Sequence, residues 1–287
     1  MPEGPEVKVT VDSLRLKLVN QNLFLVQIQI PPNSKYKTKP IPGIELFQQF
    51  PMPIAITDIF CKGKQIFFNF NNQLYLNSTL GIGGRWTYNP ENNICLILGF
   101  VTGDEISNVH QNQNIQPNIN FIYFIDPRHF GNVTIFNHQD ALCKFNKIGP
   151  DILATEVSSF EWLRIFKLKK CQNKQICQVL MNQDVISGIG NYLKAEILYY
   201  AKIKPNRIVS SIIDFELENL RQISHHLIRV SYAYGGLTIK DFWNPDGKIG
   251  TFPKIIYGQS SDPLGNFIQK DKFADGRTTH WVPNVQV

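Results

Sequence analysis

The stretch NQDVISGIGNYLKAEIL, residues 182–198, is the most informative part of this chain. Gly188 and Gly190 punctuate a turn, and Asn191 begins a strongly helical segment. Glycines ahead of a helix start let backbone amides approach a phosphate, and the helix dipole favours negative charge there. With the preceding run KQICQVLM, residues 174–181, the stretch predicts two helices joined by a double turn. A bare Gly-X-Gly also suits an ordinary helical hairpin, so both interpretations stay open at this point.

The chain on both sides of this stretch is also predicted to be helical. Residues 158–166 and 214–232 carry spaced apolar positions without the alternation of strands. After residue 234 the sequence becomes rich in Gly and Pro. Three short runs there predict strands of a small terminal hairpin unit: TFPKIIYG (251–258), NFIQKD (266–271) and THWVP (279–283).

The first half of the chain has a different pattern. Apolar residues recur at helical spacing over residues 5–19, which predicts one amphipathic helix. Short β-rich runs separated by Gly, Pro and Asn follow, and they indicate an antiparallel sandwich or barrel. These runs are residues 24–30, 64–70, 74–79, 93–100 and 120–126. The polar segment 108–120 is predicted to be a loop, and no function is assigned to it.

These patterns predict an α+β chain of two domains. Residues 1–140 are expected to form a domain with an N-terminal helix and an antiparallel β-sandwich. Residues 141–157, which include the Gly-Pro break of KIGPDILATEV, form a linker. Residues 158–243 are expected to form a helical domain, and residues 244–287 a β-hairpin finger.

The N-terminus MPEGPEV is the candidate reactive centre. Removal of Met1 would make Pro2 a free secondary amine beside the carboxylate of Glu3. An N-terminal amine titrates near pH 8, so a useful fraction is nucleophilic at neutral pH. Its attack on an aldehyde-level carbon gives an iminium ion, and Glu3 could supply the proton transfers. The same residues also make a good helix start, with proline and carboxylates in the first turn.

Composition restricts the class of protein. The 287 residues carry a net charge of +6 and a pI near 9.0, which permits an anionic partner. The five cysteines are scattered and odd in number, so we expect reduced thiols with neither disulfides nor a metal site, and no cofactor. No signal peptide or membrane span is recognisable. We therefore expect a soluble, intracellular protein.

Five motifs together resemble the formamidopyrimidine-DNA glycosylase and endonuclease VIII family of base-excision repair enzymes. PEGPEV resembles the family's catalytic terminus in its endonuclease VIII form, and GKQIFFNF (63–70) its lysine-bearing strand. IDPRHFG (125–131) resembles the DNA-inserting loop, and residues 182–198 the helix-two-turn-helix signature. GRTTHWVPNVQ (276–286) resembles the tip of the C-terminal finger. Five motifs in the family's order cover nearly the whole chain.

The resemblance implies roles for individual residues. Pro2 would attack the sugar C1′ carbon of a flipped nucleotide, and Glu3 would help to open the sugar ring. Lys64 would contact a phosphate next to the lesion and assist base release. Asn191 and Arg277 would bind phosphates that flank the extruded nucleotide.

The family also fills the hole that a flipped base leaves in the duplex. Arg128 and Phe130 match two of the intercalating positions, and Ile82 in TLGIGGRW matches the third. Phe130 could instead be a core aromatic, but its place between His129 and Gly131 in a polar turn favours exposure.

Two features depart from the family's usual pattern. Val282 and Val285 keep the spacing of a Cys-X-X-Cys pair, and Leu264 occupies another ligand position, so no thiolate zinc site is possible. We expect a zincless finger held by apolar packing of these three residues. The segment 235–252 resembles the lesion-covering segment of formamidopyrimidine-DNA glycosylases, whereas PEGPEV indicates endonuclease VIII. The two halves therefore indicate different substrates.

The resemblance implies a bifunctional DNA glycosylase and apurinic/apyrimidinic lyase acting by β,δ-elimination. Oxidised pyrimidines, hydantoins and formamidopyrimidines are the expected lesions, and a preference for 8-oxoguanine is an alternative. The expected partner is damaged DNA, duplex or single-stranded, and the expected state is a monomer. Two other classes stay open: a damage-binding protein that does not cut, and an N-terminal-proline enzyme acting on small carbonyl compounds.

Overall fold

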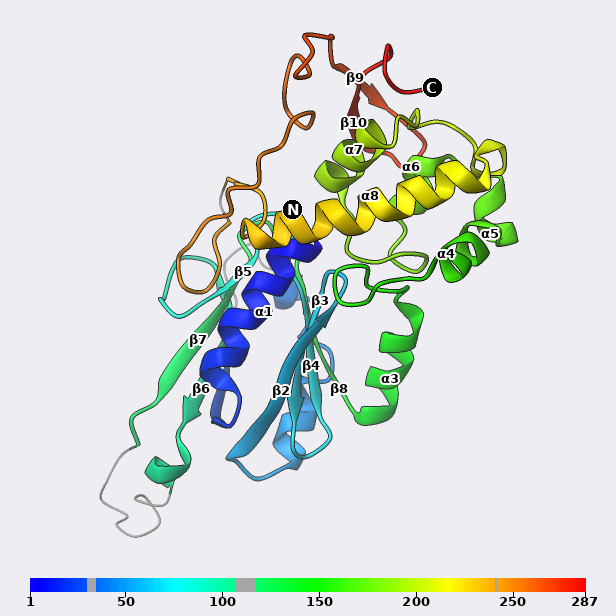
Figure 1. Cartoon of the computed structure of the whole chain (residues 1–287). Helices are drawn as coiled ribbons and strands as arrows, with labels where there is room; N and C mark the ends of the chain where they lie inside the picture. The colour runs from blue at the N-terminus through cyan, green and yellow to red at the C-terminus, as the bar shows by residue number, and fades with distance from the viewer. Residues whose placement is uncertain (30–34, 107–116, 241) are drawn as a thin grey trace. The chain divides into compact units, whose positions relative to one another are not determined.

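The computed structural model of residues 1–287 describes all residues except 30–34, 107–116 and 241 (Figure 1). The chain divides into two compact units. The first unit comprises Met1–Pro2, Glu6–Asn146 and Thr238–Gly250, and the second comprises Glu3–Pro5, Lys147–Leu237 and Thr251–Val287. Most of the polar loop predicted at 108–120 lies outside the described residues.

The first unit is built on an eight-stranded antiparallel sheet in the order β5-β7-β6-β1-β2-β3-β4-β8. Strands β1 and β2 pair through only two residue pairs, Asn22 with Ala55 and Leu23 with Ile54. This narrow junction lets the four-stranded halves fold into a sandwich. The strands are β1 (Asn22–Ile28), β2 (Ile54–Lys62), β3 (Gln65–Phe70), β4 (Tyr75–Thr79), β5 (Arg85–Thr87), β6 (Ile94–Val101), β7 (Asn120–Ile125) and β8 (Asn132–Phe136).

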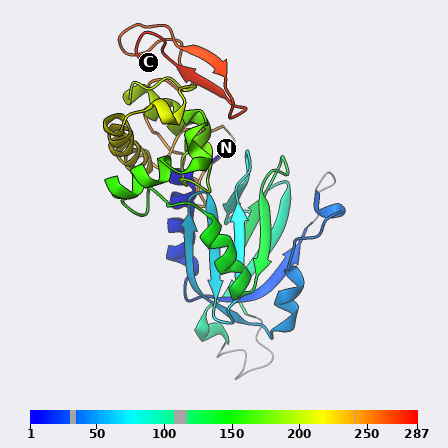
Figure 2. The same cartoon turned by 90° about the vertical axis from the view of Figure 1, so that its right-hand side faces the viewer.

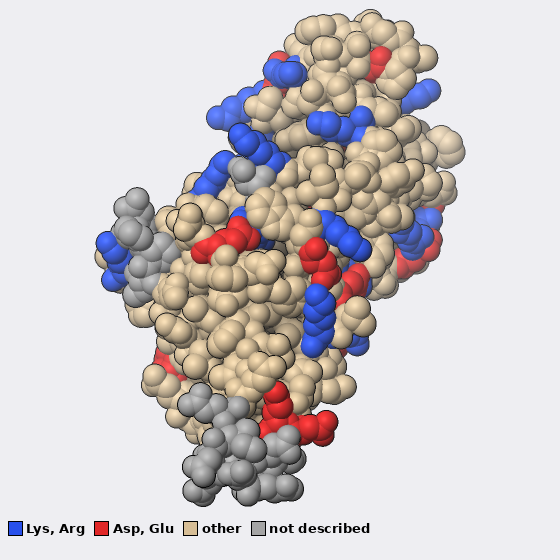
Figure 3. All heavy atoms as spheres, turned by 90° about the vertical axis from the view of Figure 1, so that its left-hand side faces the viewer, with Lys and Arg blue, Asp and Glu red and all other residues tan. Residues whose placement is uncertain are grey.

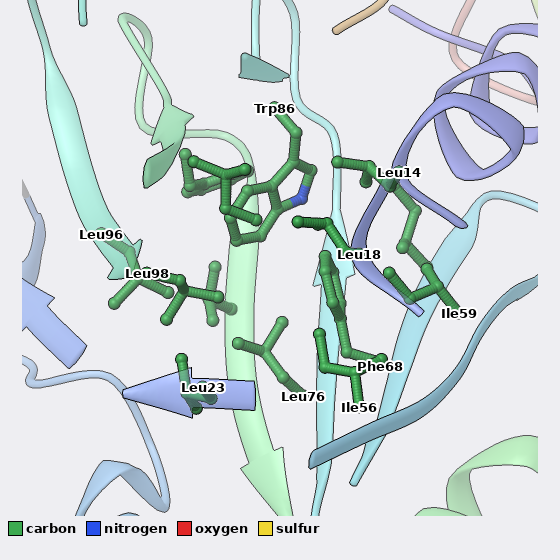
Figure 4. Packing of buried hydrophobic residues seen from close by; sticks show 14 of the residues in the cluster. Leu14, Leu18, Leu23, Ile56, Ile59, Phe68, Leu76, Trp86, Leu96 and Leu98 are labelled. Carbon is green, nitrogen blue, oxygen red and sulfur yellow. The ribbon is translucent and has the colours of Figure 1, made fainter. Parts of the chain in front are cut away.

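Helix α1 (Gly4–Leu18) contributes its apolar stripe to the core of the sandwich. Figure 4 shows Leu14 and Leu18 of this helix among apolar side chains from both halves of the sheet, with Trp86 among them. Phe242 and Ile239 of the returning segment 238–250 belong to the same cluster. The predicted helix, sandwich and five strands are confirmed, and β2, β5 and β8 complete the sheet.

The region predicted to be a linker is partly helical. Helix α3 (His138–Lys147) covers its first residues, and Phe145 of this helix contacts the rings of Phe60 and Phe67 at centroid distances of 6.2 Å. The 3₁₀ helices η1 (Lys35–Lys37) and η2 (Ile44–Gln49) complete the helices of the first unit that have defined bounds.

The second unit is a helical bundle with a terminal hairpin. Its helices are α4 (Ser159–Phe166), α5 (Lys169–Gln172), α6 (Ile176–Met181), α7 (Asn191–Tyr200), η3 (Val209–Ser211) and α8 (Asp214–Ala233). Ser158 begins α4 as its N-cap, because its hydroxyl accepts the Glu161 N–H at 3.2 Å. The four helices predicted from apolar spacing are confirmed.

The hairpin contains two strands, β9 (Gln269–Lys272) and β10 (Thr278–Trp281), drawn in orange and red in Figure 2. The strand predicted at 251–258 is wrong, because those residues have no strand pairing. Their amides are bound instead by a side chain of α7, as described below. Among the described residues no helix is long and apolar enough to cross a membrane.

Candidate active site

The carboxylate of Glu3 lies at the N-terminus of α7 in the second unit. Its Oε2 accepts the Gly190 N–H at 2.6 Å and the Leu193 N–H at 3.4 Å, and its Oε1 accepts the Tyr192 N–H at 2.9 Å. Glu3 is only 3% exposed. A carboxylate at this position satisfies orphan amides and complements the helix dipole. The anion bound by this glycine turn is therefore Glu3, and the expectation that these amides approach a phosphate is wrong.

The glycines of both motifs are explained by this contact. A Cβ on Gly190 would lie 2.2 Å from Glu3 Cδ, so any side chain there would displace the carboxylate. The Gly4 N–H donates to the Gly188 carbonyl oxygen at 2.8 Å, and Gly188 has a φ of 103°. Glu3 and Gly4 of PEGPEV thus pack directly against the stretch NQDVISGIGNYLKAEIL within the second unit.

Pro2 and Lys64 belong to the first unit. Pro2 is buried and directly precedes Glu3 in the chain. Lys62 pairs with Gln65, so Gly63 and Lys64 form a two-residue turn between β2 and β3. Gly63 has a φ of 59°, which suits a tight hairpin. Lys64 was expected on a strand, but it lies in this turn and is partly exposed.

The three predicted void-filling residues lie on two loops of the first unit that contact each other. Ile82 is in the turn between β4 and β5, whereas Arg128 and Phe130 are between β7 and β8. A Cβ on Gly81 would lie 2.5 Å from the Gly131 nitrogen, so the loops approach at backbone distance. Phe130 is 65% exposed, which confirms its predicted exposure and excludes a core role.

The Asp126 carboxylate fixes the shape of the β7–β8 loop. This residue is 0% exposed, and its Oδ2 accepts the Gly131 N–H at 2.9 Å. Its carbonyl oxygen accepts the His129 N–H at 3.3 Å, and His129 adopts a φ of 57°. A rigid turn of this kind presents Phe130 without burying it.

Asn191 and the turn that carries Arg277 are brought together in the second unit. The Asn191 Nδ2 donates to the Thr278 carbonyl oxygen at 3.0 Å, which joins the first turn of α7 to β10. Arg277 is exposed, and its backbone N–H donates to Asp275 Oδ1 at 3.1 Å. Gly276 has a φ of 72° and so permits the tight turn before Arg277.

The finger is held by apolar packing and by buried polar side chains. Val282 is 0% exposed and packs with Tyr199, Ile256 and Ile268, with Val285 partly buried at the edge of this cluster. Leu264 is 81% exposed, so its predicted packing role is wrong. Leu264 lies in a turn in which Asp262 accepts the N–H groups of Leu264 and Asn266. Its match to a zinc-ligand position therefore did not predict whether its side chain is buried.

Two carboxylates organise the root of the finger. Glu196 of α7 is 1% exposed and accepts three backbone N–H groups, from Ile255 at 3.2 Å, Ile256 at 2.9 Å and Tyr257 at 2.8 Å. Burial raises the pKa of Glu196, and these three amides oppose that effect. Asp262 accepts the Tyr199 hydroxyl at 3.1 Å. No cluster of three or more His, Cys, Asp or Glu capable of holding a metal occurs in the part of the chain that the structure describes.

Sequence reasoning missed Lys194, Glu196, Asp262 and Asp275. All four are charged residues with at most a few per cent of their surface or side chain exposed. The only signal available in the sequence was a lysine and a glutamate inside the apolar helix YLKAEIL. Their partners lie far along the chain, so pattern reasoning could not pair them.

Basic side chains are frequent on the part of the surface that Figure 3 shows. In Figure 3 the blue Lys and Arg atoms spread over the upper part of the view, where red Asp and Glu atoms are sparse. Such a face attracts a polyanion.

Comparison with known proteins gives consistent matches in both halves. Residues 1–133 match the model of the formamidopyrimidine-DNA glycosylase N-terminal domain, and residues 148–242 match that of the formamidopyrimidine-DNA glycosylase H2TH domain. The formamidopyrimidine-DNA glycosylase of Rickettsia felis is 30% identical over 100% of this chain and 98% of its own length. That of Mycoplasma genitalium is 28% identical over 100% of the chain and 96% of its length.

Solved structures share the fold. The Fpg protein of Thermus thermophilus superposes with a TM-score of 0.79 at 23% identity, covering 99% of this chain and 98% of that one. A Lactococcus lactis Fpg bound to DNA that contains an abasic site has a TM-score of 0.79 at 22% identity, with 99% of both chains covered.

Proposed function

Because the chain belongs to the formamidopyrimidine-DNA glycosylase family, whose members are DNA-binding glycosylases of base-excision repair, we propose that it is a bifunctional DNA glycosylase and apurinic/apyrimidinic lyase with Pro2 as nucleophile. The observation that carries this proposal is the buried carboxylate of Glu3, the residue that follows Pro2. Three backbone N–H groups at the start of α7 hold this carboxylate in place. A proton-transfer group held this rigidly suits a reaction at the adjacent amine.

The reaction begins once Met1 is removed. The Pro2 nitrogen forms a bond to C1′ of the damaged nucleotide, and the glycosidic bond breaks with its electron pair leaving on the base. Glu3 takes up the proton that the Pro2 amine loses and passes it to the sugar ring oxygen, which leaves C1′ and gives a positively charged iminium. Loss of a C2′ proton then expels the 3′ phosphate, and loss of a C4′ proton expels the 5′ phosphate. Water hydrolyses the iminium, which frees Pro2 and the sugar fragment, and a one-nucleotide gap is left.

The proposed DNA contacts rest on the positions that match the family's motifs. Lys64 in its turn, Asn191 at the start of α7 and Arg277 at the finger tip bind backbone phosphates. Ile82, Arg128 and Phe130 fill the space that the flipped base leaves. Their position on two mutually packed loops, with Phe130 65% exposed, supports this role because an intercalating side chain must leave the core and still be held rigidly.

Oxidised pyrimidines, hydantoins and formamidopyrimidines are the proposed lesions. Structures with this fold from Lactococcus lactis hold DNA containing N7-benzyl-Fapy-dG and DNA containing an oxidised pyrimidine, so related proteins accommodate both classes. The endonuclease VIII-like form of PEGPEV favours the pyrimidines in this chain. Excision rates on a panel that includes 8-oxoguanine would rank the lesions, and fastest excision of 8-oxoguanine would contradict this preference.

Borohydride trapping tests the nucleophile. The protein is incubated with a duplex containing an abasic site, and borohydride reduces the iminium to a stable amine, which joins the protein to DNA. We expect an adduct at Pro2 in the chain that lacks Met1 and none in a chain blocked by an uncleaved N-terminal tag. Lys64→Leu should keep the adduct. An adduct mapped to a lysine, or binding of damaged DNA without an adduct or strand cleavage, would refute the assignment.

Glu3→Gln separates the two activities. Base excision should fall strongly because proton transfer is lost, whereas cutting at a preformed abasic site should stay measurable. Equal losses on both substrates would show that Glu3 is needed for the fold or for both steps.

A further inference from the structure

A buried ion pair joins α7 to the tip of the finger. Lys194 is 0% exposed, the Asp275 side chain is 2% exposed, and Lys194 Nζ contacts Asp275 Oδ2. Burying two charges is costly unless further hydrogen bonds satisfy both groups. We propose that Lys194 and Asp275 are positioning residues that orient Asn191 and the Arg277 turn for phosphate binding. This inference rests on the proposed function, since it takes both residues as DNA ligands.

Lys194 fixes which way the Asn191 amide faces. Its Nζ donates to Asn191 Oδ1 at 2.9 Å. An ammonium group has only donors, so the oxygen of the amide must face it and the nitrogen must face away. One Nδ2 hydrogen then donates to the Thr278 carbonyl at 3.0 Å. The second hydrogen is left for an anionic ligand, which is the orientation that phosphate binding requires.

Asp275 fixes the turn that presents Arg277. Its Oδ2 contacts Lys194, and its Oδ1 accepts the Arg277 backbone N–H at 3.1 Å. Both carboxylate oxygens are thus used within the protein, while the Arg277 residue itself is exposed. A free Asp275 carboxylate would attract the guanidinium and compete with a phosphate. Pairing with Lys194 removes that competition.

The tip is also held by contacts that do not involve this pair. Gln178 Nε2 donates to the Ala274 carbonyl at 3.1 Å, and the Ala274 N–H donates to Gln175 Oε1 at 3.2 Å. These bonds attach the tip to α6. Removal of the ion pair should therefore leave the hairpin attached while the orientation of Asn191 and Arg277 becomes free.

The test replaces both charges together. Removing one partner would leave a buried charge, whereas replacing a buried pair with apolar residues of similar volume is often neutral for stability. We expect Lys194→Met with Asp275→Leu to melt within about 3 °C of the wild type. Its affinity for a duplex with a tetrahydrofuran abasic site should fall about tenfold, as for loss of a charged hydrogen bond. The log–log salt slope should fall by about one.

Coupling distinguishes positioning from a general effect on the fold. Asn191→Ala and Arg277→Ala should each weaken binding in the wild type but have little further effect in the double variant. The reason is that side chains that are already misoriented contribute little to the affinity for DNA. Two results would overturn the positioning role while the proposed function stands. Either Asn191→Ala and Arg277→Ala weaken binding as much in the double variant as in the wild type, or the double variant itself binds with the affinity and salt slope of the wild type. Wild-type binding by Asn191→Ala and Arg277→Ala would instead overturn the phosphate-binding part of the proposed function and this inference with it.

A matched pair of variants decides the question if the apolar double variant does not fold. Lys194→Gln and Lys194→Met, each combined with Asp275→Asn so that no buried charge is left unpaired, have similar volume at position 194, but only glutamine can donate to Asn191 Oδ1. Affinity for the same duplex should therefore be higher for the glutamine variant. Equal affinities would show that the amide is not oriented by a donor at position 194.

Discussion

Replacement of Gly190 by alanine tests the contact that organises the proposed active site. The added Cβ would lie 2.2 Å from Glu3 Cδ, 2.4 Å from Oε1 and 2.6 Å from Cγ, where ordinary contacts begin at 3.4 Å. The backbone at Gly190 has a φ of −129°, which alanine adopts without strain. The overlap must therefore be relieved by the Glu3 carboxyl group, which has to move by about 1 Å, enough to cost about 100-fold in the rate of a positioned reaction.

Two quantities follow from this displacement. A 100-fold loss in single-turnover excision of an oxidised pyrimidine corresponds to about 2.7 kcal/mol of transition-state stabilisation. Weakened bonds to the amides of Gly190, Tyr192 and Leu193 should also lower the free energy of unfolding by about 1–3 kcal/mol. For a chain of this size that is a fall in melting temperature of about 2–4 °C per kcal/mol.

Gly103→Ala is the matched control. A Cβ at Gly103 would have nothing within 4 Å, so both excision and stability should stay at the wild-type level, within about 0.5 kcal/mol. Wild-type excision and melting by Gly190→Ala would refute the conclusion that the glycine is required by Glu3. A stability loss without an excision loss would show that the carboxylate serves the fold alone.

Four further substitutions and a pH series test other parts of the molecule. Val282→Ser should lower the free energy of unfolding by about 1–3 kcal/mol in a denaturant titration because Val282 is 0% exposed, whereas Leu264→Ser, at an 81% exposed position, should change it little. Phe130→Ala should leave the melting temperature unchanged and reduce excision from duplex DNA more than cleavage of a single-stranded abasic substrate; equal losses would contradict a void-filling role. Burial lowers the pKa of His225 below its ordinary value of 6.5, and its Nε2 accepts the Val157 N–H at 3.2 Å, so the neutral ring is the folded form. Below pH 6.5 the unfolded chain binds a proton at this histidine that the folded chain does not. Stability should therefore fall as the pH decreases from 6.5 through the folded pKa. The difference between the melting temperatures at pH 7.5 and pH 5.0 should be smaller for His225→Gln than for the wild type.

Local patterns predicted the elements of the fold well. Helical spacing located α1, α4, α6, α7 and α8, and β-rich runs located β1, β3, β4, β6 and β7. These predictions succeed because amphipathic periodicity reports which face of an element is buried. The prediction at 251–258 failed because that segment is apolar for a different reason: Ile256 fills the finger core while its N–H is bound by Glu196.

The candidate residues were found through motifs, but their partners were not. Glu3 and Gly190 are 187 residues apart, and Lys194 and Asp275 are 81 apart. Neither contact has a periodic signature, because each depends on the chain's tertiary path and not on local spacing. The glycine turn shows the consequence: its sequence correctly indicated an anion at the start of α7, yet only the fold shows that the anion is the protein's own carboxylate.

The Glu3 carboxylate occupies the place at the start of α7 that a bound anion would take. The N–H groups of Gly190, Tyr192 and Leu193 are bound by Glu3, so we expect any phosphate at the start of α7 to be bound by side chains instead. Asn191 is the nearest of these, and its amide is oriented by Lys194 and Thr278 and not by the helix dipole. Three buried charged side chains thus have different roles along α7. Glu3 completes its N-terminus, Lys194 orients the residue proposed to bind phosphate, and Glu196 holds the root of a finger whose paired valines carry no thiolates.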